Sequence, residues 1–455
     1  MSNTDVAIVI LAAGEGTRMK STLPKVLHPL AGRPMLGHIL DRVKQFGADL
    51  TVVVVGPEMK KVTQFVAPVD TVIQDNPMGT AHAVLATREL LEGRSEDVLI
   101  LFGDTPLLSE DTMKMIIEVR RGKNNPAVVV LGFTPDDPGE YGRLVIGKKG
   151  ELEKIVEYRD SNEEEKKISL CNAGIMAIDG KRLFNLLDEV ENDNAKGEFY
   201  LSDIVGICRS RGWGCVVVET DDPDEVMGIN SRTDLAQAEA VFQCQMRLAA
   251  MEQGCTLQDP DTVWFSHDTQ LGEGVVVGPD VVFGPGVKIG DNVEIKPFCH
   301  IEGASVEENA IIGPFARLRP GADIGQDVNI GNFVEIKEAR LEQGAKANHL
   351  TYIGDSWVGA GANIGAGSIT CNYDGFNKNR TEIGREAFIG SNTALVAPVT
   401  IGARAITGAG SVITKDVEAD ALAITRGPQE QRAGWALKYR IQKQKSLENK
   451  NKKSG

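Results

Sequence analysis

The sequence predicts two domains of different fold class: an α/β domain with a mostly parallel, Rossmann-like sheet, followed by a parallel β-helix of hexapeptide repeats. Two periodicities lead to this prediction. Up to about residue 230, short apolar runs alternate with helical patterns, and from Leu271 onward apolar residues recur every six positions. A chain of 455 residues is also too long for a single core, so two or three domains are expected.

The first domain is predicted over residues 1–230. The runs VAIVIL, LTVVVVG, VLILFGD and AVVVLGF indicate buried parallel strands, because both faces of such strands are covered and both are apolar. Helical stretches such as GTAHAVLATRELLEG lie between them. Ligands of such sheets bind at the carboxyl ends of the strands, so we expect the functional residues of this domain at those ends.

A glycine-rich stretch, LAAGEGTRM, follows the first predicted strand. It fits neither common phosphate motif, because a dinucleotide fingerprint needs a third glycine at Met19 and a P-loop needs Gly-Lys-Ser/Thr from that position. Gly14 and Gly16 would still let backbone N–H groups and a helix N-terminus approach a phosphate. An ordinary β–α turn is an equally good interpretation of this stretch alone.

Residues 231–253 predict a single connecting helix, capped by Ser231 or Thr233 and ended by Gly254. The β-helix is predicted over residues 254–437, where a loop, CNYDGFNKNRTEIG, interrupts the repeats. After one-residue slips the six-residue series resumes, and its apolar positions are Leu271, Val277, Phe283, Ile289, Ile295, Ile301, Ile312, Leu318, Ile324, Ile330, Ile336, Ile353, Ile364, Ile389, Leu395 and Ile401. Residues 438–455 are basic and polar, and we expect them to be disordered.

Composition limits the function classes. A net charge of −15 argues against a nucleic-acid partner. Seven scattered cysteines without a C-x-x-C pair suit reduced thiols in the cytoplasm. The first apolar run is about eight residues long, which is too short to cross a membrane, and its flank does not suit a signal peptide. We therefore expect a cytoplasmic protein without a membrane partner.

Motifs in both halves resemble one enzyme family. They are LAAGEGTRM with LPKVLH, GDTPLL, YGRLV, CNAGIM and GIN in the first half, and NHLTYIGD and CNYDG within the hexapeptide repeats. In this order they resemble the bacterial bifunctional N-acetylglucosamine-1-phosphate uridylyltransferase / glucosamine-1-phosphate acetyltransferases, from about Asp5 to residue 437. The resemblance implies a left-handed β-helix and a homotrimer with acetyl-transfer sites between subunits.

The resemblance also implies two reactions. The second domain acetylates glucosamine-1-phosphate with acetyl-CoA. The first transfers UMP from UTP to the resulting N-acetylglucosamine-1-phosphate, giving pyrophosphate and UDP-N-acetylglucosamine for peptidoglycan and lipopolysaccharide precursors. Two rival interpretations are a nucleotidyltransferase with a merely structural or regulatory solenoid and a non-catalytic assembly protein. His349 and the CNYDG loop weigh against the first rival, and the intact site of the first domain weighs against the second.

In uridylyl transfer the attacking phosphate is already an anion, so the reaction needs positive charge rather than a base. The resemblance places Arg18 and Lys25 at the triphosphate and Mg²⁺ between Asp104 and Asn230. An Asp after a strand is otherwise more often a helix N-cap. The remaining substrate contacts carried over are Leu11, Ala12, Ala13 and Gly14 near the uridine, Gln74, Gly79 and Thr80 at the uracil, Gly142, Glu157 and Asn172 at the sugar, and Phe102 and Gly103 beside Asp104. Phe102, where relatives often have Tyr, and Glu15, where they have a neutral or basic residue, depart from the family pattern.

Acetyl transfer needs a base that titrates near neutrality, and His349 matches the base of the family. A lone His on a solenoid is otherwise more often a packing or surface residue. Side chains that flank inward positions point outward, which predicts that Arg319, Glu335, Lys337, Tyr352 and Asn363 face a ligand.

By resemblance, these outward residues and the loop bind the substrates of acetyl transfer. Arg319 and Lys337 hold the sugar phosphate, and Glu335 orients the base or a loop residue. The sugar contacts are Tyr352, Asn363, Asn372 and Tyr373, and the acetyl-CoA contacts are Ala366, Ser391, Ala409 and Arg426. Cys371 adjoins this site, but a His base permits direct transfer without an acetyl-cysteine.

Overall fold

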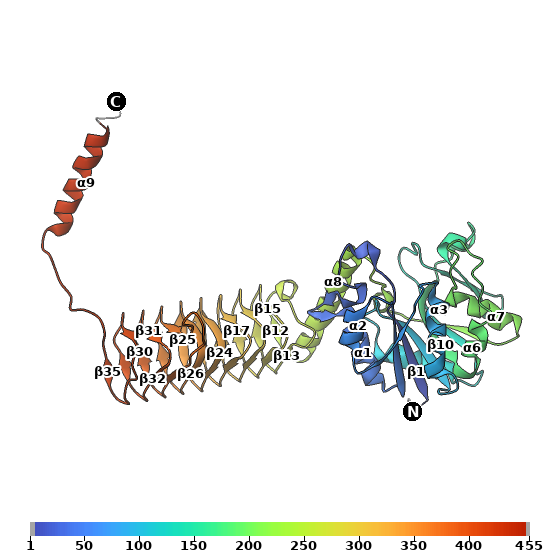
Figure 1. The fold of residues 1–455 in the computed structure, drawn as a ribbon, viewed down its shortest axis with the longest axis horizontal. Coiled ribbons are helices and arrows are strands. Elements are labelled where there is room, and N and C mark those ends of the chain that lie inside the picture. The colour runs from blue at the N-terminus through green and yellow to red at the C-terminus, as the bar shows by residue number, and fades with distance from the viewer. Residues whose placement is uncertain (1–4, 452–455) are drawn as a thin grey trace. The chain divides into compact units, whose positions relative to one another are not determined.

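The computed structural model describes residues 5–451, which form two compact units (Figure 1). The first unit comprises Met1–Gln253 and Trp264–Thr269, and the second comprises Gly254–Val263 and Gln270–Gly455. Within the described residues, no helix has the length and apolarity that crossing a membrane requires.

A nine-stranded sheet forms the middle layer of the first unit, in the order β11-β7-β10-β6-β1-β4-β5, with β8 beside β10 and β9 beside β8. The strands pair in parallel except where β10 runs against β6, β7 and β8 and where β8 runs against β9. The mostly parallel sheet predicted from the sequence is therefore present. Its strands are β1 (Val6–Leu11), β4 (Leu50–Val55), β5 (Asp70–Ile73), β6 (Asp97–Phe102), β7 (Val128–Phe133), β8 (Arg143–Ile146), β9 (Leu152–Val156), β10 (Cys171–Asp179) and β11 (Cys215–Glu219), and β2 (Pro29–Leu30) and β3 (Arg33–Pro34) form a separate hairpin.

Helices cover both faces of this sheet. α1, α2 and α5 contribute to the apolar cluster on one face, and α3, α6 and α7 to the cluster on the other. The helices are α1 (Met35–Phe46), α2 (Lys60–Val66), α3 (Thr80–Leu85), α4 (Arg88–Leu91), α5 (Glu110–Arg120), α6 (Gly180–Leu187), α7 (Ile204–Ser210) and α8 (Arg232–Glu252). Short 3-10 turns are η1 (Thr17–Met19), η2 (Lys25–Leu27), η3 (Tyr158–Asp160), η4 (Glu165–Lys167), η5 (Leu201–Asp203) and η6 (Pro223–Val226), with η7 (Pro260–Thr262) in the second unit.

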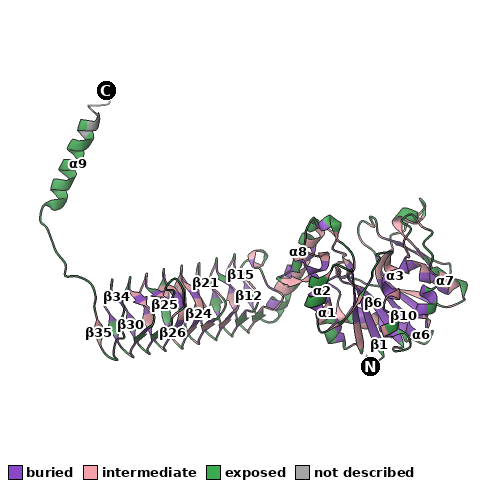
Figure 2. Cartoon of the chain, in the orientation of Figure 1, coloured by how far each residue is buried: buried purple, intermediate pink, exposed green. Residues whose placement is uncertain are grey.

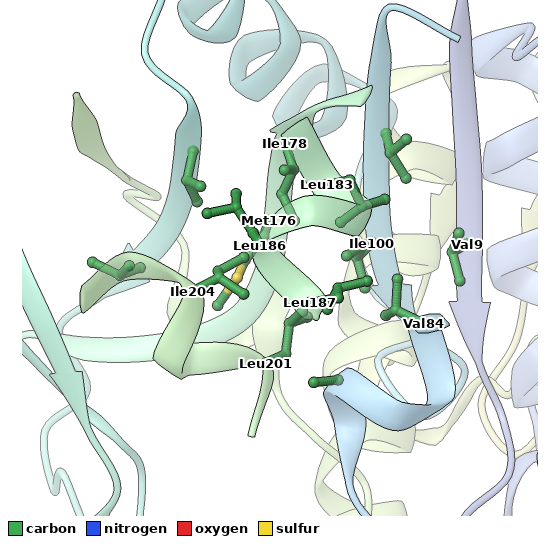
Figure 3. Close-up of a cluster of buried hydrophobic side chains, with 14 of the residues drawn as sticks. Val9, Val84, Ile100, Met176, Ile178, Leu183, Leu186, Leu187, Leu201 and Ile204 are labelled. Carbon is green, nitrogen blue, oxygen red and sulfur yellow. The ribbon is translucent and has the colours of Figure 1, made fainter. Parts of the chain in front are cut away.

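The two faces of the sheet explain why its strands are apolar throughout. Along β1, Val9 packs into one cluster and the neighbouring Ile8 into the other, and both are fully buried. Figure 3 shows the first cluster, in which Leu183 of α6 lies with Ile100 and Met176 of the sheet. Each such side chain contributes about 1.5–3 kcal/mol of burial free energy, so this core holds the carboxyl ends of β1 and β6 in place.

Helix α8 occupies the segment for which the connecting helix was predicted, and it belongs to the first unit. Its capping box is complete: Ser231 Oγ accepts from the backbone N–H of Asp234, and the Asp234 carboxylate accepts from the N–H of Ser231. Asp234 also accepts from the backbone N–H of Asn230 at 2.9 Å. The helix start therefore fixes the residue just before it.

The second unit is a left-handed β-helix whose strands stack in three parallel ladders (Figure 1). The first ladder contains β12 (Thr256–Leu257), β14 (Val276–Val277), β17 (Glu294–Ile295), β20 (Ile311–Ile312), β23 (Asn329–Asn332), β25 (Lys346–His349), β27 (Asn363–Ile364), β30 (Phe388–Ile389), β33 (Ile406–Thr407) and β35 (Leu422–Ala423). The second contains β13 (Gln270–Leu271), β16 (Lys288–Ile289), β19 (Ala304–Val306), β22 (Ala322–Ile324), β29 (Thr381–Ile383) and β32 (Val399–Ile401), and the third contains β15 (Val282–Phe283), β18 (His300–Ile301), β21 (Arg317–Leu318), β28 (Ile369–Cys371), β31 (Ala394–Val396) and β34 (Val412–Ile413). The longer β24 (Glu335–Leu341) and β26 (Tyr352–Val358) belong to both of the latter ladders.

The predicted six-residue series forms the interior of the β-helix. Val277, Phe283 and Ile301 are essentially buried, and the residue before each of them is more exposed. Figure 2 shows this alternation of buried and exposed positions along the coils. The predicted loop projects between β28 and β29, where Phe376 is 92% exposed.

The tail differs from the prediction. Helix α9 (Trp435–Asn451) covers most of the segment for which we expected disorder, and residues 452–455 lie outside the described part of the chain. Lys, Arg, Gln and Leu are good helix formers, and no Gly or Pro interrupts them here. Side chains 435–447 are exposed. The local helix propensity of the segment accounts for the helix.

Candidate active sites

A cavity of about 610 Å³ lies in the first unit, at the carboxyl ends of β1 and β6. Most of the predicted residues of this unit line it: Leu11, Ala12, Ala13, Gly14, Lys25, Gln74, Gly79, Thr80, Phe102, Asp104, Gly142, Glu157, Asn172 and Asn230. They come from segments between residues 11 and 230, which only the fold brings together.

Two predicted residues, Arg18 and Gly103, do not line this cavity. Arg18 lines an adjoining cavity of about 360 Å³ with Arg159 and Lys196, and Glu157 borders both cavities. Gly103 is packed instead, since a Cβ there would lie 3.2 Å from Val26 and 3.3 Å from Leu36.

The glycine-rich loop is open toward the cavity at Gly14 and closed at Gly16. A Cβ on Gly14 would meet nothing within 4 Å. Gly16 has a φ of +65°, and a Cβ on it would lie 2.5 Å from Lys25 Cβ, so glycine is required for Lys25 to approach. The loop continues into the single turn η1 rather than into a long helix.

Lys25, Asp104 and Asn230 converge in this cavity. The Lys25 ammonium donates to the Asp104 carboxylate and, at 3.0 Å, to Asn230 Oδ1. The Lys25 and Asp104 side chains are 12% and 14% exposed. Two hard oxygens thus point at one cation position, a donor set that fits Mg²⁺, which keeps several water ligands of its own.

The alternative role of Asp104 as a helix N-cap is not what the structure shows. Ser109 caps α5, and its Oγ accepts from the backbone N–H of Thr112 at 3.1 Å. Asp104 therefore remains available to the cavity.

Rigid contacts shape the far wall of the cavity. Gln74 is 4% exposed and donates to the carbonyl of Gly79 at 3.1 Å. Gly79 has a φ of +113°, and a Cβ there would lie 2.5 Å from the carbonyl oxygen of Phe199. Thr80 Oγ1 accepts from the backbone N–H of Leu201 at 2.9 Å. These contacts hold the residues predicted to bind uracil.

Glu157 is one of the acidic groups that line the cavity. Burial raises its pKa, and Ser202 Oγ donates to its Oε1 at 3.2 Å. Ser202 and Lys196 also line the cavity, although neither was predicted from the sequence. Both lie after α6, in a stretch where no strand end was predicted.

Five of the predicted acetyl-transfer residues of the β-helix project outward, whereas Asn372 is buried. Leu318, Ile336, Ile353 and Ile364 are buried, whereas Arg319, Glu335, Lys337, Tyr352 and Asn363 beside them are partly exposed, as the register predicts. Arg319 donates to Glu335 Oε1 at 2.8 Å.

Lys337 shares its surroundings with a residue that was not predicted. The ammonium group of Lys378 in the projecting loop, together with burial, lowers the pKa of Lys337. The carboxylate of Asp355 lies 4.0 Å from Lys337 Nζ. Asn372 donates to Asp355 and lies 3.4 Å from the hydroxyl of Tyr352. Two ammonium groups and an arginine suit a phosphate dianion.

His349 ends β25 and is exposed. Its Nδ1 lies 2.8 Å from Asn332 Oδ1 on the preceding coil. Glu335 was predicted to orient the base or a loop residue, but its hydrogen bond goes to Arg319 and the ring of His349 bonds to Asn332 instead.

His349 and the residues predicted to contact acetyl-CoA lie along one edge of the β-helix. The carbonyl of His349 accepts from Gly367, that of Ala366 from Asn392, and that of Ser391 from Gly410. Arg426 Nη1 then donates to the carbonyl of Ala409 at 2.8 Å. Each bond joins the same turn of successive coils, so these residues form a column beginning at the histidine.

Comparisons with known proteins cover both units. Residues 8–170 match the MobA-like NTP transferase domain, and residues 268–303, 303–338 and 380–415 match the bacterial transferase hexapeptide (six repeats). The chain is 56% identical over 442 residues to the bifunctional protein GlmU of Paramagnetospirillum magneticum, which covers 97% of this chain and 98% of that protein. It is 60% identical over 437 residues to the protein of that name from Rhodospirillum rubrum, covering 96% and 98%.

The chain belongs to the bifunctional GlmU family. It is therefore a bifunctional enzyme with uridylyltransferase and glucosamine-1-phosphate acetyltransferase activities. Membership in the GlmU family also implies small-molecule, nucleotide-sugar substrates and a divalent metal ion.

Proposed function

We propose that this enzyme acetylates glucosamine-1-phosphate on the edge of the β-helix and then transfers UMP from UTP to N-acetylglucosamine-1-phosphate in the cavity of the first unit. The products of the second step are UDP-N-acetylglucosamine and pyrophosphate, and the nucleotide sugar serves peptidoglycan and lipopolysaccharide precursor synthesis. The convergence of Lys25, Asp104 and Asn230 in one cavity carries the proposal.

For uridylyl transfer, Asp104 and Asn230 would hold Mg²⁺, which neutralises charge on the triphosphate and orients it. Lys25 and Arg18 add positive charge that offsets the repulsion between the attacking sugar phosphate and UTP. The rigid wall at Gln74 and Gly79 holds the uracil. Glu157 binds a sugar hydroxyl, where its burial excludes water from the hydrogen bond.

For acetyl transfer, His349 takes a proton from the sugar amine as the amine attacks the thioester of acetyl-CoA. The C–N bond forms, the C–S bond breaks, and the CoA thiolate leaves. Arg319 and Lys337, with Lys378 from the loop, hold the sugar phosphate, and Tyr352 with Asn363, Asn372 and Tyr373 holds the sugar. The cofactor lies along the column from Ala366 through Ser391 and Ala409 to Arg426, whose guanidinium suits a CoA phosphate.

A homotrimer with acetyl-transfer sites between subunits completes the proposal. Phe298, Phe315 and Phe333 stack on one another along the same edge, with ring centroids 4.8 and 5.2 Å apart. They are 50%, 45% and 54% exposed, and Leu350 beside His349 is 62% exposed. An apolar column of this kind favours burial against a second copy of the chain. The seven free cysteines suit a cytoplasmic enzyme.

A coupled assay tests the proposal. The enzyme is supplied with glucosamine-1-phosphate, acetyl-CoA, UTP and Mg²⁺, and UDP-N-acetylglucosamine is measured by chromatography. Leaving out acetyl-CoA should abolish the product, and adding N-acetylglucosamine-1-phosphate should restore it. Product formation from UTP and N-acetylglucosamine-1-phosphate, without any consumption of acetyl-CoA in the complete mixture, would instead support a merely structural β-helix.

A further inference from the structure

The imidazole of His349 needs a fixed orientation to act as a base, and the structure shows what could supply it. A neutral imidazole carries one N–H and one lone pair, and the hydrogen bond at one nitrogen decides which nitrogen is free. Asn332 Oδ1 lies 2.8 Å from His349 Nδ1. Because a carbonyl oxygen only accepts, this bond places the proton on Nδ1 and leaves the lone pair on Nε2.

The pairing of two coils fixes this contact. Asn332 and His349 are register partners at the ends of β23 and β25. The backbone N–H of Leu350 donates to the carbonyl of Asn332 at 3.0 Å, and Gly367 donates to the carbonyl of His349 at 3.2 Å. Both backbones are thus held on each side of the ring, so the amide is aimed at Nδ1 by the solenoid itself.

We infer that Asn332 is the positioning residue of the acetyl-transfer base: its amide oxygen holds His349 in the Nδ1–H tautomer and turns Nε2 toward the sugar amine. The inference rests on the proposed role of His349 as the base. A carboxylate in the same place would also stabilise the imidazolium, whereas the uncharged amide orients the ring without holding the proton on it. The base therefore stays free to accept a proton.

The groups around the ring allow this inference to be tested through pH. Of the strands that pair with β25, β23 presents the uncharged Asn332 at the ring, and the chain after β27 presents Gly367. The nearest titratable groups along the chain are Lys346 on β25 itself and Tyr352 at the start of β26, while Glu335 of β24 bonds to Arg319. A new charge at position 332 would thus be the only one added beside the ring.

The experiment compares Asn332→Asp and Asn332→Ala with a matched control, Asn329→Asp. Asn329 lies on the same strand but pairs with Lys346 rather than with His349. Acetyl transfer is measured from pH 5.5 to 9. Asn332→Asp keeps an acceptor, so it should retain most of its kcat at high pH while the acidic limb of the kcat profile moves up by roughly one pH unit. Asn332→Ala frees the ring and should lower kcat by up to about 10²-fold with little change in KM.

Two further readings separate the possible outcomes. In ¹⁵N-histidine spectra, assigned with His349→Ala, the His349 signal should show the Nδ1–H tautomer in the wild type and a mixture in Asn332→Ala. An unchanged tautomer and pH profile in both Asn332 variants would overturn the inference even if His349→Ala is inactive. Full activity of His349→Ala would instead overturn the proposed base. If Asn332→Ala fails to fold, the nearly isosteric Asn332→Asp decides through its pH profile.

Discussion

The two proposed sites are built in opposite ways. In the first unit, segments between residues 11 and 230 enclose a cavity within one chain, where Lys25 and Asp104 are about one-eighth exposed. On the β-helix, His349 is exposed at the end of β25, and Tyr373 lies in the projecting loop, where it is 62% exposed. Many residues of the cavity lie at strand ends or in the loops that follow them, whereas most of the predicted acetyl-transfer residues belong to the strands and turns of the β-helix.

This difference shows what each fold supplies. An α/β sheet gathers strand ends and can therefore close a pocket around charges within one chain. A solenoid presents regular columns, so it aligns residues with precision but leaves them open on one side. The edge of the β-helix is open to solvent, so a transition state there can be enclosed only if another protein surface covers it. For this reason we propose that the acetyl-transfer site lies between copies of the chain.

The largest expected effect is on the metal position of the cavity. Asp104→Ala removes the only carboxylate of the proposed pair and leaves the Lys25 ammonium without its carboxylate partner, so uridylyl transfer should fall by at least about 10³-fold. Acetyl transfer should change less than twofold. Asp221→Ala, at an exposed position of the same unit, is the matched control. Equal losses of both activities would mean that the two sites are not independent, and normal Mg²⁺-dependent turnover would exclude Asp104 as a ligand.

The reverse pattern is expected for the edge. His349→Ala should lower acetyl transfer by roughly 10²- to 10⁴-fold, the usual contribution of a general base, and should leave uridylyl transfer intact. Raising the pH should restore part of the activity by deprotonating the amine. His300→Ala is the control, because His300 is also a histidine exposed on the β-helix, where it lies 3.9 Å from Glu302. Full acetyl transfer by His349→Ala at neutral pH would contradict the assignment.

The sequence predicted the location of both sites better than the contacts between individual side chains within them. Six-residue periodicity identified which residues face out of the β-helix, and strand ends identified where the cavity lies. Asn332 could not be predicted as the partner of His349, because one-residue slips between coils decide which residues become neighbours. Lys378 lies in a loop and Ser202 in the single 3-10 turn η5, where long-range contacts rather than a local pattern set the position. Helix α9 was missed because local helix propensity needs no apolar face.

Glycine-to-alanine substitutions should affect substrate binding in the open cavity but stability in the packed coils of the β-helix. Gly14 borders empty space, so Gly14→Ala should leave the melting temperature unchanged but place a methyl group where the nucleotide binds, raising KM for UTP by roughly tenfold or more. Gly402 lies against the backbone nitrogen of Ala419 on the next coil, so Gly402→Ala should lower the melting temperature of the β-helix by about 5 °C. Differential scanning calorimetry with both assays measures this. A destabilised Gly14→Ala or an unaffected Gly402→Ala would reverse the comparison.

The smallest expected effect is on the acid sensitivity of the two units. Burial lowers the pKa of His38 to about 4; the positive charges of His267 and Arg33 lower it further, whereas the hydrogen bond to the Leu30 carbonyl and the charge of Asp41 raise it. A depressed histidine pKa stabilises the fold above about pH 6.5, and this stability is lost as the pH falls toward 4. The histidines described on the β-helix, His300 and His349, are exposed. Acid should therefore act on the first unit through a group that the second lacks.

A second buried group in the first unit, Asp203, changes the stability with pH in the direction opposite to His38. Burial raises the pKa of Asp203 to about 6, so its stabilising contribution is present below about pH 4 and is lost as the pH rises through 6. Between pH 7 and 5 the two contributions largely cancel in the wild type. Asp203→Asn removes the contribution of Asp203, so on going from pH 7 to pH 5 the free energy of unfolding of the first unit should end about 1 kcal/mol lower, relative to its pH 7 value, than in the wild type. His38→Gln removes the contribution of His38, and the same quantity should end about 2 kcal/mol higher than in the wild type. Both shifts are measured as changes in the urea concentration that abolishes uridylyl transfer. The urea concentration that abolishes acetyl transfer should stay constant. Parallel shifts of the two activities would show that the units do not unfold independently.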